Sequence, residues 1–226
     1  MFRNRRIAVF TLHAMAFIAF LGISSLQISL GLDRAMAADE TAAPPKDAAP
    51  VAEPALPDMA LGKADAPVTI VEYSSLSCPH CAHFHKEVFP ALKSDYIDTG
   101  KVRYIQREFP LNNPALAGSV LARCIDSARF FAFNALLFEK QEDWAFKDDA
   151  FKPLRLYAKQ AGLTDADFEK CLDNEDLQKK ILAVRERGEK EGVKGTPTFF
   201  INGKIYNGAP TLQALAEAIK PYLSTQ

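Results

Sequence analysis

Two cysteines stand two residues apart in the sequence Cys78-Pro79-His80-Cys81. This spacing places both sulfurs within one helical turn, close enough to form a disulfide. Pro79 suits the first turn of a helix because it has no N–H to leave unpaired. Cys78 would then lie at the helix N-terminus, where free N–H groups and the helix dipole favour a thiolate. The pattern predicts a reactive Cys78 of low pKa, a shielded Cys81, and a catalytic pair assisted by His80, which becomes cationic in mild acid.

A metal site is the main alternative chemistry for this segment. Cys78, Cys81, His83 and His85 place four soft donors within eight residues, as a copper or zinc carrier requires. The two histidines differ by two positions, however, and two such residues point to different faces of a helix. A purely structural disulfide at this spacing would close only a very small loop and stabilise little. We therefore expect redox chemistry without a metal, and keep the metal carrier as the alternative.

A second signal lies far along the chain, at Gly195-Thr196-Pro197-Thr198, just before a strand rich in Phe. Pro197 cannot donate to a strand ladder, so its place at a strand start is favourable. A cis Thr196–Pro197 bond would make a tight, fixed turn there. An ordinary trans proline at the strand start is the other possibility.

A strand–helix–strand unit surrounds the cysteine pair. Residues 68–73 are β-branched and apolar, which predicts a buried strand. A helix is expected from Cys78 to Ser94, and a second strand at 102–109. A unit of this length makes its two strands parallel.

A helical block follows. Apolar residues recur every three or four positions from Ala117 to Phe138, which predicts one long amphipathic helix. Thr164 with Asp167 has the pattern of a capping box, and Asn174 is a typical N-cap. Three further helices are predicted at residues 151–161, 164–172 and 174–191.

The strand pattern returns at 198–201 and 204–206, joined by Asn202-Gly203, a strong hairpin signal. A last helix begins near Thr211. The two flanks are too small to be separate domains, so we expect one α/β fold with a mixed sheet and helices on both faces. The helical block, about residues 114–191, would be an insertion on one side.

The N-terminus has the features of a secretory signal. Positive residues precede an apolar stretch, and Ala35-Met36-Ala37 fits the cleavage pattern, which predicts a signal peptide at 1–37. The uncharged run is also long enough for an uncleaved inner-membrane anchor. Both interpretations place the rest of the chain outside the cytoplasm. Residues 38–57 are rich in Ala, Pro and acidic residues, which predicts a disordered linker.

Composition excludes several classes of protein. The 226 residues include 27 Lys and Arg against 28 Asp and Glu, so there is no basic excess typical of nucleic-acid binding. Four cysteines are too few to build a disulfide-rich scaffold, and 48% hydrophobic residues can form a packed core.

Together, Cys78-Pro79-His80-Cys81 after a strand, the Thr196-Pro197 loop and the helical insertion resemble the thioredoxin superfamily, and within it the DsbA-like thiol:disulfide oxidoreductases of the bacterial periplasm. The resemblance covers about residues 58–226. It implies a thioredoxin-like fold, a cis Pro197 facing the active disulfide, and substrate lying along the Thr196-Pro197 loop. It also implies a mixed disulfide at Cys78 and no cofactor beyond the redox-active disulfide. The implied partners are reduced or unfolded secreted proteins and a DsbB-like membrane oxidase.

Three features refine this resemblance. Glu72 occupies the buried acidic position of the family, and a buried charge needs a partner, for which we predict Arg103 on the neighbouring strand. Thr196 precedes the predicted cis-proline, as in isomerase-like and reductase-like relatives, and its hydroxyl could donate to the Cys78 thiolate. The alternative to an oxidase is therefore a disulfide isomerase or reductase. Only a linker precedes the fold, so we expect a monomer.

Cys124 and Cys171 fall on separate predicted helices of the insertion. In an oxidising compartment we expect them to form a structural disulfide, which would stabilise the fold by about 3–4 kcal/mol in the chain-entropy model. Two buried reduced thiols are the alternative.

Overall fold

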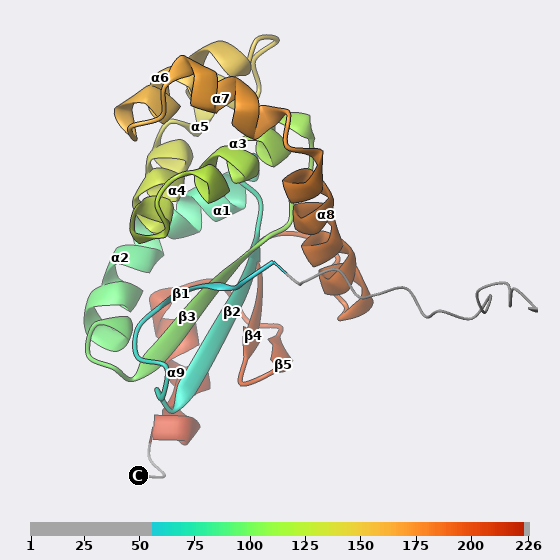
Figure 1. The fold of residues 1–226 in the computed structure, drawn as a ribbon. Coiled ribbons are helices and arrows are strands. Elements are labelled where there is room, and N and C mark those ends of the chain that lie inside the picture. The colour runs from blue at the N-terminus through green and yellow to red at the C-terminus, as the bar shows by residue number, and fades with distance from the viewer. Residues whose placement is uncertain (1–55, 224–226) are drawn as a thin grey trace, which may run out of the picture. The chain divides into compact units, whose positions relative to one another are not determined.

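The protein is described by a computed structural model over residues 56–223 (Figure 1). The predicted signal peptide and residues 38–55 of the predicted linker lie outside these residues. Leu56 packs against the apolar cluster that contains Tyr73 and Phe200, and the Pro57 carbonyl accepts a hydrogen bond from Arg123.

One mixed sheet with the strand order β1-β3-β2-β4-β5 forms the centre of the fold. Strands β2 and β3 are parallel, as the strand–helix–strand pattern predicts, whereas the other neighbouring pairs are antiparallel. The strands span Met59–Leu61 (β1), Val68–Ser74 (β2), Val102–Glu108 (β3), Thr198–Ile201 (β4) and Lys204–Tyr206 (β5). The predicted Asn202-Gly203 turn connects β4 and β5.

The helical segment after β2 runs from Pro79 to Ile97, three residues beyond its predicted end. It comprises α1 (Pro79–His83), a π-helical segment (Phe84–Val88), α2 (Phe89–Leu92) and a second π-helical segment (Lys93–Ile97). Pro90 lies in its middle and has no N–H for the carbonyl one turn earlier. The first π-helical segment ends just before Pro90, and a π-helical turn is one way in which a helix accommodates a missing backbone hydrogen bond.

On one face of the sheet, apolar side chains of the strands pack with this helical segment and with α9 (Leu212–Leu223) in one hydrophobic core. Its buried residues alternate along β2 and β3, as expected where one sheet face is covered. Helix α8 (Glu175–Lys190) covers part of the other face, through Val184. The core consists of Val68, Ile70, Phe84, Val88, Leu92, Ile97, Val102, Tyr104, Phe199, Ile201, Leu215 and Ile219.

The helices between β3 and β4 form the predicted insertion; α5 to α7 lie at the upper end of the view in Figure 1, and α8 runs down beside the sheet. Besides α8 they are α3 (Asn113–Cys124), a short 3-10 turn (Ser127–Arg129), α4 (Phe130–Glu139), α5 (Gln141–Trp144), α6 (Phe151–Gln160) and α7 (Asp165–Leu172). The predicted capping box of Thr164 with Asp167 opens α7, and Asn174 caps α8. These local signals therefore place two helix starts correctly.

The prediction of one long helix over 117–138 is wrong, because the chain leaves the helical conformation after Cys124. Ile125 has an extended backbone, and the Asp126 side chain accepts a hydrogen bond from the Ala128 N–H. Asp offers the backbone such local partners and competes with helix continuation. The apolar periodicity continues across the break because α3 and α4 line the same core.

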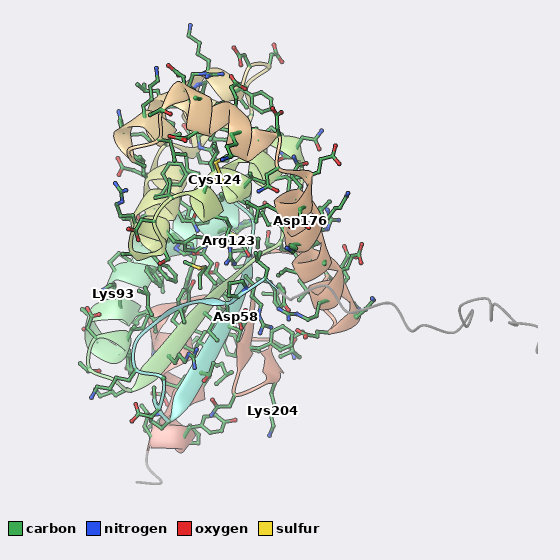
Figure 2. All side chains as sticks on the ribbon, in the orientation of Figure 1. Asp58, Lys93, Arg123, Cys124, Asp176 and Lys204 are labelled. Atoms are coloured by element: carbon green, nitrogen blue, oxygen red, sulfur yellow. A yellow bond between two sulfur atoms is a disulfide. The ribbon has the colours of Figure 1, made fainter. Side chains whose placement is uncertain are left out.

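Arg123 connects the insertion to the sheet (Figure 2). Its guanidinium donates to both carboxylate oxygens of Glu108 on β3, and both side chains are 6% exposed. The same guanidinium donates to the Pro57 carbonyl at 2.7 Å. A buried pair of this kind fixes geometry, since losing one partner would leave the other charge buried alone.

No helix within residues 56–223 is long and apolar enough to cross a membrane.

Candidate active site

Cys78 is the N-cap of α1, and Pro79 occupies the first turn, as the sequence pattern predicts. The backbone of Cys78 is extended, and the turn before it closes through a hydrogen bond from its N–H to the Ser75 carbonyl at 3.0 Å. Cys78 is 5% exposed and Cys81 is fully buried, and both are free thiols. A helix start thus presents one sulfur towards the surface and places the other inside.

The two thiols differ strongly in acidity. The pKa of Cys78 is lowered to about 5, chiefly by a hydrogen bond from the Cys81 thiol, with further contributions from Thr196 and from the backbone N–H groups of Cys81 and His80. Burial raises the pKa of Cys81, and the negative charges of Cys78 and Glu72 raise it further. At neutral pH Cys78 is therefore the nucleophile and Cys81 holds the proton.

The Thr196–Pro197 peptide bond is cis, as the resemblance implies, and lies against the reactive sulfur. In the thiol form Cys78 donates to the Thr196 carbonyl oxygen, at 3.1 Å. The Thr196 hydroxyl is buried and has no hydrogen-bond partner within residues 56–223. The contact is thus made by the carbonyl in the thiol form, and the hydroxyl is the Thr196 group able to donate once the thiolate forms.

A groove of about 460 Å³ runs beside this loop. The exposed His80 and the half-buried Thr196 and Pro197 line one part of it, and Lys194 and Ile205 line another. An extended chain laid in the groove would lie beside the cis-proline and next to Thr196, whose carbonyl contacts the Cys78 sulfur.

Glu72 lies on β2, is fully buried and accepts two hydrogen bonds at one oxygen. Tyr104 donates to Oε2 through its hydroxyl, and the His85 Nε2 lies 2.9 Å from the same oxygen. Oε1 has no hydrogen-bond partner among the described residues. The predicted burial of Glu72 is therefore confirmed.

The predicted pairing of Glu72 with Arg103 is wrong. Arg103 lies opposite Thr69 in the parallel register, whereas Glu72 lies opposite Gln106. Because side chains alternate along a strand, Arg103 points to the opposite sheet face from Glu72. The partner comes instead from the helical segment, thirteen residues after Glu72 in the chain.

The metal-carrier alternative finds no support in this arrangement. His83 is exposed, while His85 is turned inward, onto Glu72 and against the ring of Phe138. No group of three or more His, Cys, Asp or Glu side chains that could hold a metal ion occurs in the part of the chain that the structure describes.

Gln141 is a site residue that sequence reasoning does not reveal. Its buried side-chain amide donates to the carbonyls of Leu76 and Cys78, at 2.7 and 3.0 Å. Gln141 belongs to α5, so the insertion holds the turn that carries the reactive sulfur. No local signal could reveal this contact, because 63 residues separate Gln141 from Cys78.

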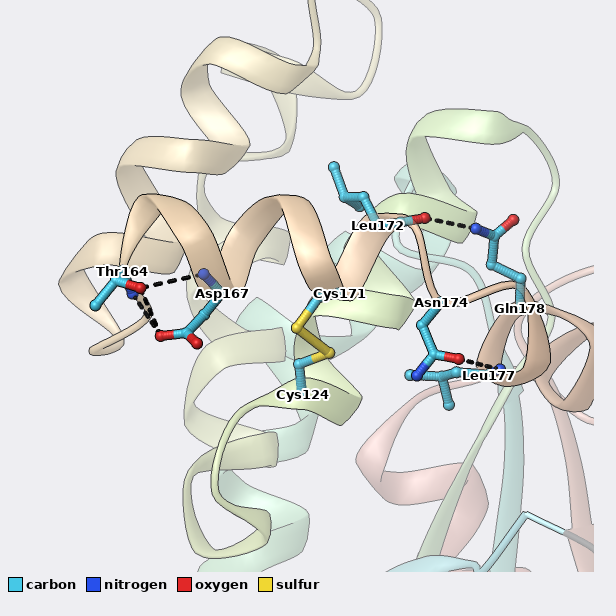
Figure 3. The surroundings of a disulfide bond; sticks show 8 residues. All are labelled: Cys124, Thr164, Asp167, Cys171, Leu172, Asn174, Leu177 and Gln178. Carbon is cyan, nitrogen blue, oxygen red and sulfur yellow. Dashed lines mark hydrogen bonds between the residues drawn. A yellow bond between two sulfur atoms is a disulfide. The ribbon is translucent and has the colours of Figure 1, made fainter.

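Cys124 and Cys171 form the predicted disulfide between α3 and α7, with their Cα atoms 6.2 Å apart (Figure 3). Figure 3 shows it between the Thr164 capping box at one end of α7 and the Asn174 cap of α8 at the other. The bond lies within the insertion and is distinct from the Cys78–Cys81 pair.

Comparisons with known proteins agree with this geometry. A family model described as thioredoxin matches residues 55–221. A Bacillus cereus protein of the disulfide bond formation protein D type is 30% identical over 168 residues, which cover 70% of this chain and 76% of that protein. The crystal structure of Wolbachia pipientis alpha-DsbA1 superposes with a TM-score of 0.70 and 31% identity, over 75% of this chain and 92% of that one.

The chain therefore belongs to the thioredoxin family, and within it to the DsbA-like branch. A Rickettsia bellii protein classed with the protein-disulfide oxidoreductases is 36% identical over 148 residues, 65% of this chain. The match spans 57% of the length of that relative.

Proposed function

We propose that this protein is a periplasmic thiol:disulfide oxidoreductase that transfers its Cys78–Cys81 disulfide to thiols of secreted proteins. The observation that carries the proposal is the reactive Cys78, whose pKa of about 5 goes with a raised pKa of the buried Cys81. Such a pair has one ionised, nucleophilic sulfur and one protonated, internal sulfur that opens and closes the disulfide.

The exchange has two steps. A substrate thiolate attacks Sγ of Cys78, the Cys78–Cys81 bond breaks, and its electron pair stays on Cys81. A second substrate thiolate then attacks the substrate sulfur of the mixed disulfide and releases Cys78 as a thiolate. The substrate gains a disulfide and the enzyme retains two reduced cysteines. The groove beside Thr196 and Pro197 would hold the substrate backbone extended during both steps.

The low pKa of Cys78 favours the oxidase direction. A thiolate stabilised at neutral pH is a good leaving group and stabilises the reduced enzyme, which makes the disulfide an oxidant. The alternative function is a disulfide isomerase or reductase. The feature that favours this alternative is Thr196, which precedes the cis-proline as in isomerase-like and reductase-like relatives.

The direction is tested by equilibrating purified protein with defined mixtures of reduced and oxidised glutathione. We expect the Cys78–Cys81 disulfide to be strongly oxidising and the oxidised protein to convert a two-cysteine peptide to its disulfide. A Cys78→Ser variant should be inactive and Cys124→Ala/Cys171→Ala active. A reducing, thioredoxin-like equilibrium would contradict the oxidase direction, and an inactive wild-type protein would contradict the function as a whole.

The proposed cellular location and reoxidation partner rest on the sequence. A signal peptide ending at Ala37 would deliver a monomer to the periplasm, where a DsbB-like membrane oxidase would regenerate the disulfide without a further cofactor. N-terminal sequencing of the protein from a bacterial periplasmic extract should give Ala38 as the first residue. An intact N-terminus in the membrane fraction would instead favour the uncleaved anchor.

A further inference from the structure

His85 is a buried titratable residue that the exchange steps above do not use. Its side chain is 5% exposed, although a histidine pays a high desolvation cost when it is charged and unpaired. Three aromatic rings lie near it. Phe138 stacks on it with ring centroids 4.2 Å apart and a 13° interplanar angle, and Phe84 and Phe89 lie at 5.4 and 5.1 Å.

Glu72 Oε2 is the polar contact of the His85 ring, at 2.9 Å. Glu72 in turn receives the Tyr104 hydroxyl at the same oxygen and leaves Oε1 without a hydrogen-bond partner within residues 56–223. A buried carboxylate with one bare oxygen is able to accept or hand on a proton. The pair therefore combines the His85 imidazole, which can carry a proton, with Glu72 Oε1, which can accept one.

The ionisable groups facing Glu72 come from three elements. They are His85 from the first π-helical segment, Tyr104 from β3 and Cys81 from α1. Tyr104 keeps its proton, because burial and the Glu72 charge hold its pKa well above the usual range. The His85 imidazole and the Cys81 thiol are thus the two neighbours of Glu72 that can carry a transferable proton.

Opening of the disulfide creates a demand for a proton at this site. When a thiolate attacks Cys78, the electron pair of the broken bond remains on Cys81, which is fully buried. A buried sulfur anion is costly, and the pKa of Cys81 is raised by burial, so the sulfur must take up a proton from a neighbouring group.

We propose that His85 is a positioning residue that acts through Glu72, holding on the Glu72–His85 pair the proton that Cys81 takes up when the disulfide opens. The inference rests on the proposed function. Before transfer, the pair carries one proton shared between the His85 ring and the Glu72 carboxylate, and Cys81 carries the negative charge. After transfer, Cys81 is a neutral thiol and the pair carries the negative charge, so the net charge inside the site does not change. Reoxidation reverses the transfer.

The test compares His85→Gln with wild type and with His83→Gln. The glutamine amide introduced by His85→Gln can still donate to Glu72 but cannot carry a proton, whereas His83 is exposed and two residues away. Oxidised proteins are mixed with a two-cysteine peptide, and single-turnover rates are measured by acid quench between about pH 5.5 and 8.5, which brackets the usual titration range of histidine. Dividing each variant rate by the wild-type rate removes the titration of the peptide thiols.

We expect the His85→Gln ratio to be about tenfold below one at the acid end, the range in which an imidazole side chain can supply a proton and an amide cannot, and to rise towards one at about pH 8.5. His83→Gln should stay near one throughout. Glu72→Gln should also lower the ratio, and the double variant should be no slower than the slower single variant, since both act on one proton. If His85→Gln fails to fold, as judged by circular dichroism, His85→Asn, which carries the same amide on a shorter side chain, takes its place in the comparison.

A His85→Gln ratio of one at every pH, or a loss independent of pH, would overturn the inference. The first outcome means that no proton passes through His85, and the second means that it only supports the structure. Neither outcome affects the proposed function, which fails only if the wild-type protein does not oxidise the peptide.

Discussion

The reactivity of Cys78 results from a few atoms at one helix start. The Cys81 thiol and two backbone N–H groups stabilise negative charge on its sulfur, and they outweigh the desolvation that opposes it. The sequence predicts this sulfur well, because Cys, Pro and the helix start are contiguous and the chemistry is local. It predicts the surroundings of Glu72 poorly, because the partner depends on which residue of the helical segment faces β2.

Alkylation of reduced Cys78 by iodoacetamide should therefore follow a titration with a midpoint near pH 5, the pKa that its surroundings produce. The rate should be flat from neutral pH to about pH 8, as expected for a thiol already ionised, and should fall as the pH drops through 5. Mass spectrometry of the labelled peptide measures it. Cys81→Ala removes the largest stabilising contact and should raise the midpoint, whereas an unchanged midpoint in that variant would contradict the assignment.

The same shift has a consequence for stability. A thiol whose pKa is lower in the folded than in the unfolded chain stabilises the reduced fold at pH values above the unfolded pKa. That contribution declines as the pH falls and is lost once the pH passes through about 5.

At the scale of elements, the insertion is shaped by signals of different range. Caps at Thr164 and Asn174 are read from neighbouring residues, and both are where the sequence places them. The sequence does not predict the break after Cys124, because apolar periodicity shows which face of a helix is buried and not whether the helix is continuous. The pairing of Cys124 with Cys171 is foreseeable from compartment and number, and the bridge joins the two helical regions to which the sequence assigns these cysteines.

Replacing both cysteines of this disulfide by alanine should lower the free energy of unfolding by about 3–4 kcal/mol, because the bridge closes a loop over a separation of 47 residues. Urea unfolding of the oxidised proteins measures the difference. Alkylation of Cys78 should keep its rate and its pH midpoint, since the bridge lies within the insertion. An altered midpoint would show that the bridge also controls the active site.

At the scale of the whole molecule, the insertion is part of the redox site. Gln141 reaches from α5 to two carbonyls of the turn before α1, and Arg123 holds α3 against β3. Phe138 from α4 stacks on His85. The sequence separates a sheet domain from a helical block, but it cannot show these contacts, because each joins residues distant in the chain.

Gln141→Leu should destabilise the protein by about 1–3 kcal/mol, since it removes the Gln141 donor from the buried Leu76 carbonyl and leaves the Cys78 carbonyl with the Ala82 N–H alone. It should also raise the pH midpoint of Cys78 alkylation, because the helix start that stabilises the thiolate loses its support. Thermal unfolding and the alkylation profile measure the two effects. Glu142→Ala, at the exposed neighbouring position of the same helix, is the control. Unchanged stability and midpoint in the leucine variant would separate the insertion from the redox site.

The unequal burial of the two sulfurs also determines where chemical damage falls. A low-pKa thiolate is the form most readily converted to sulfenic and then to irreversible sulfinic acid, and Cys78 meets that description in the reduced protein. Cys81, fully buried and protonated, is protected by comparison and stands ready to capture a sulfenic acid on its neighbour as a disulfide. Rapid return to the disulfide would therefore protect the enzyme as well as prepare it for the next substrate.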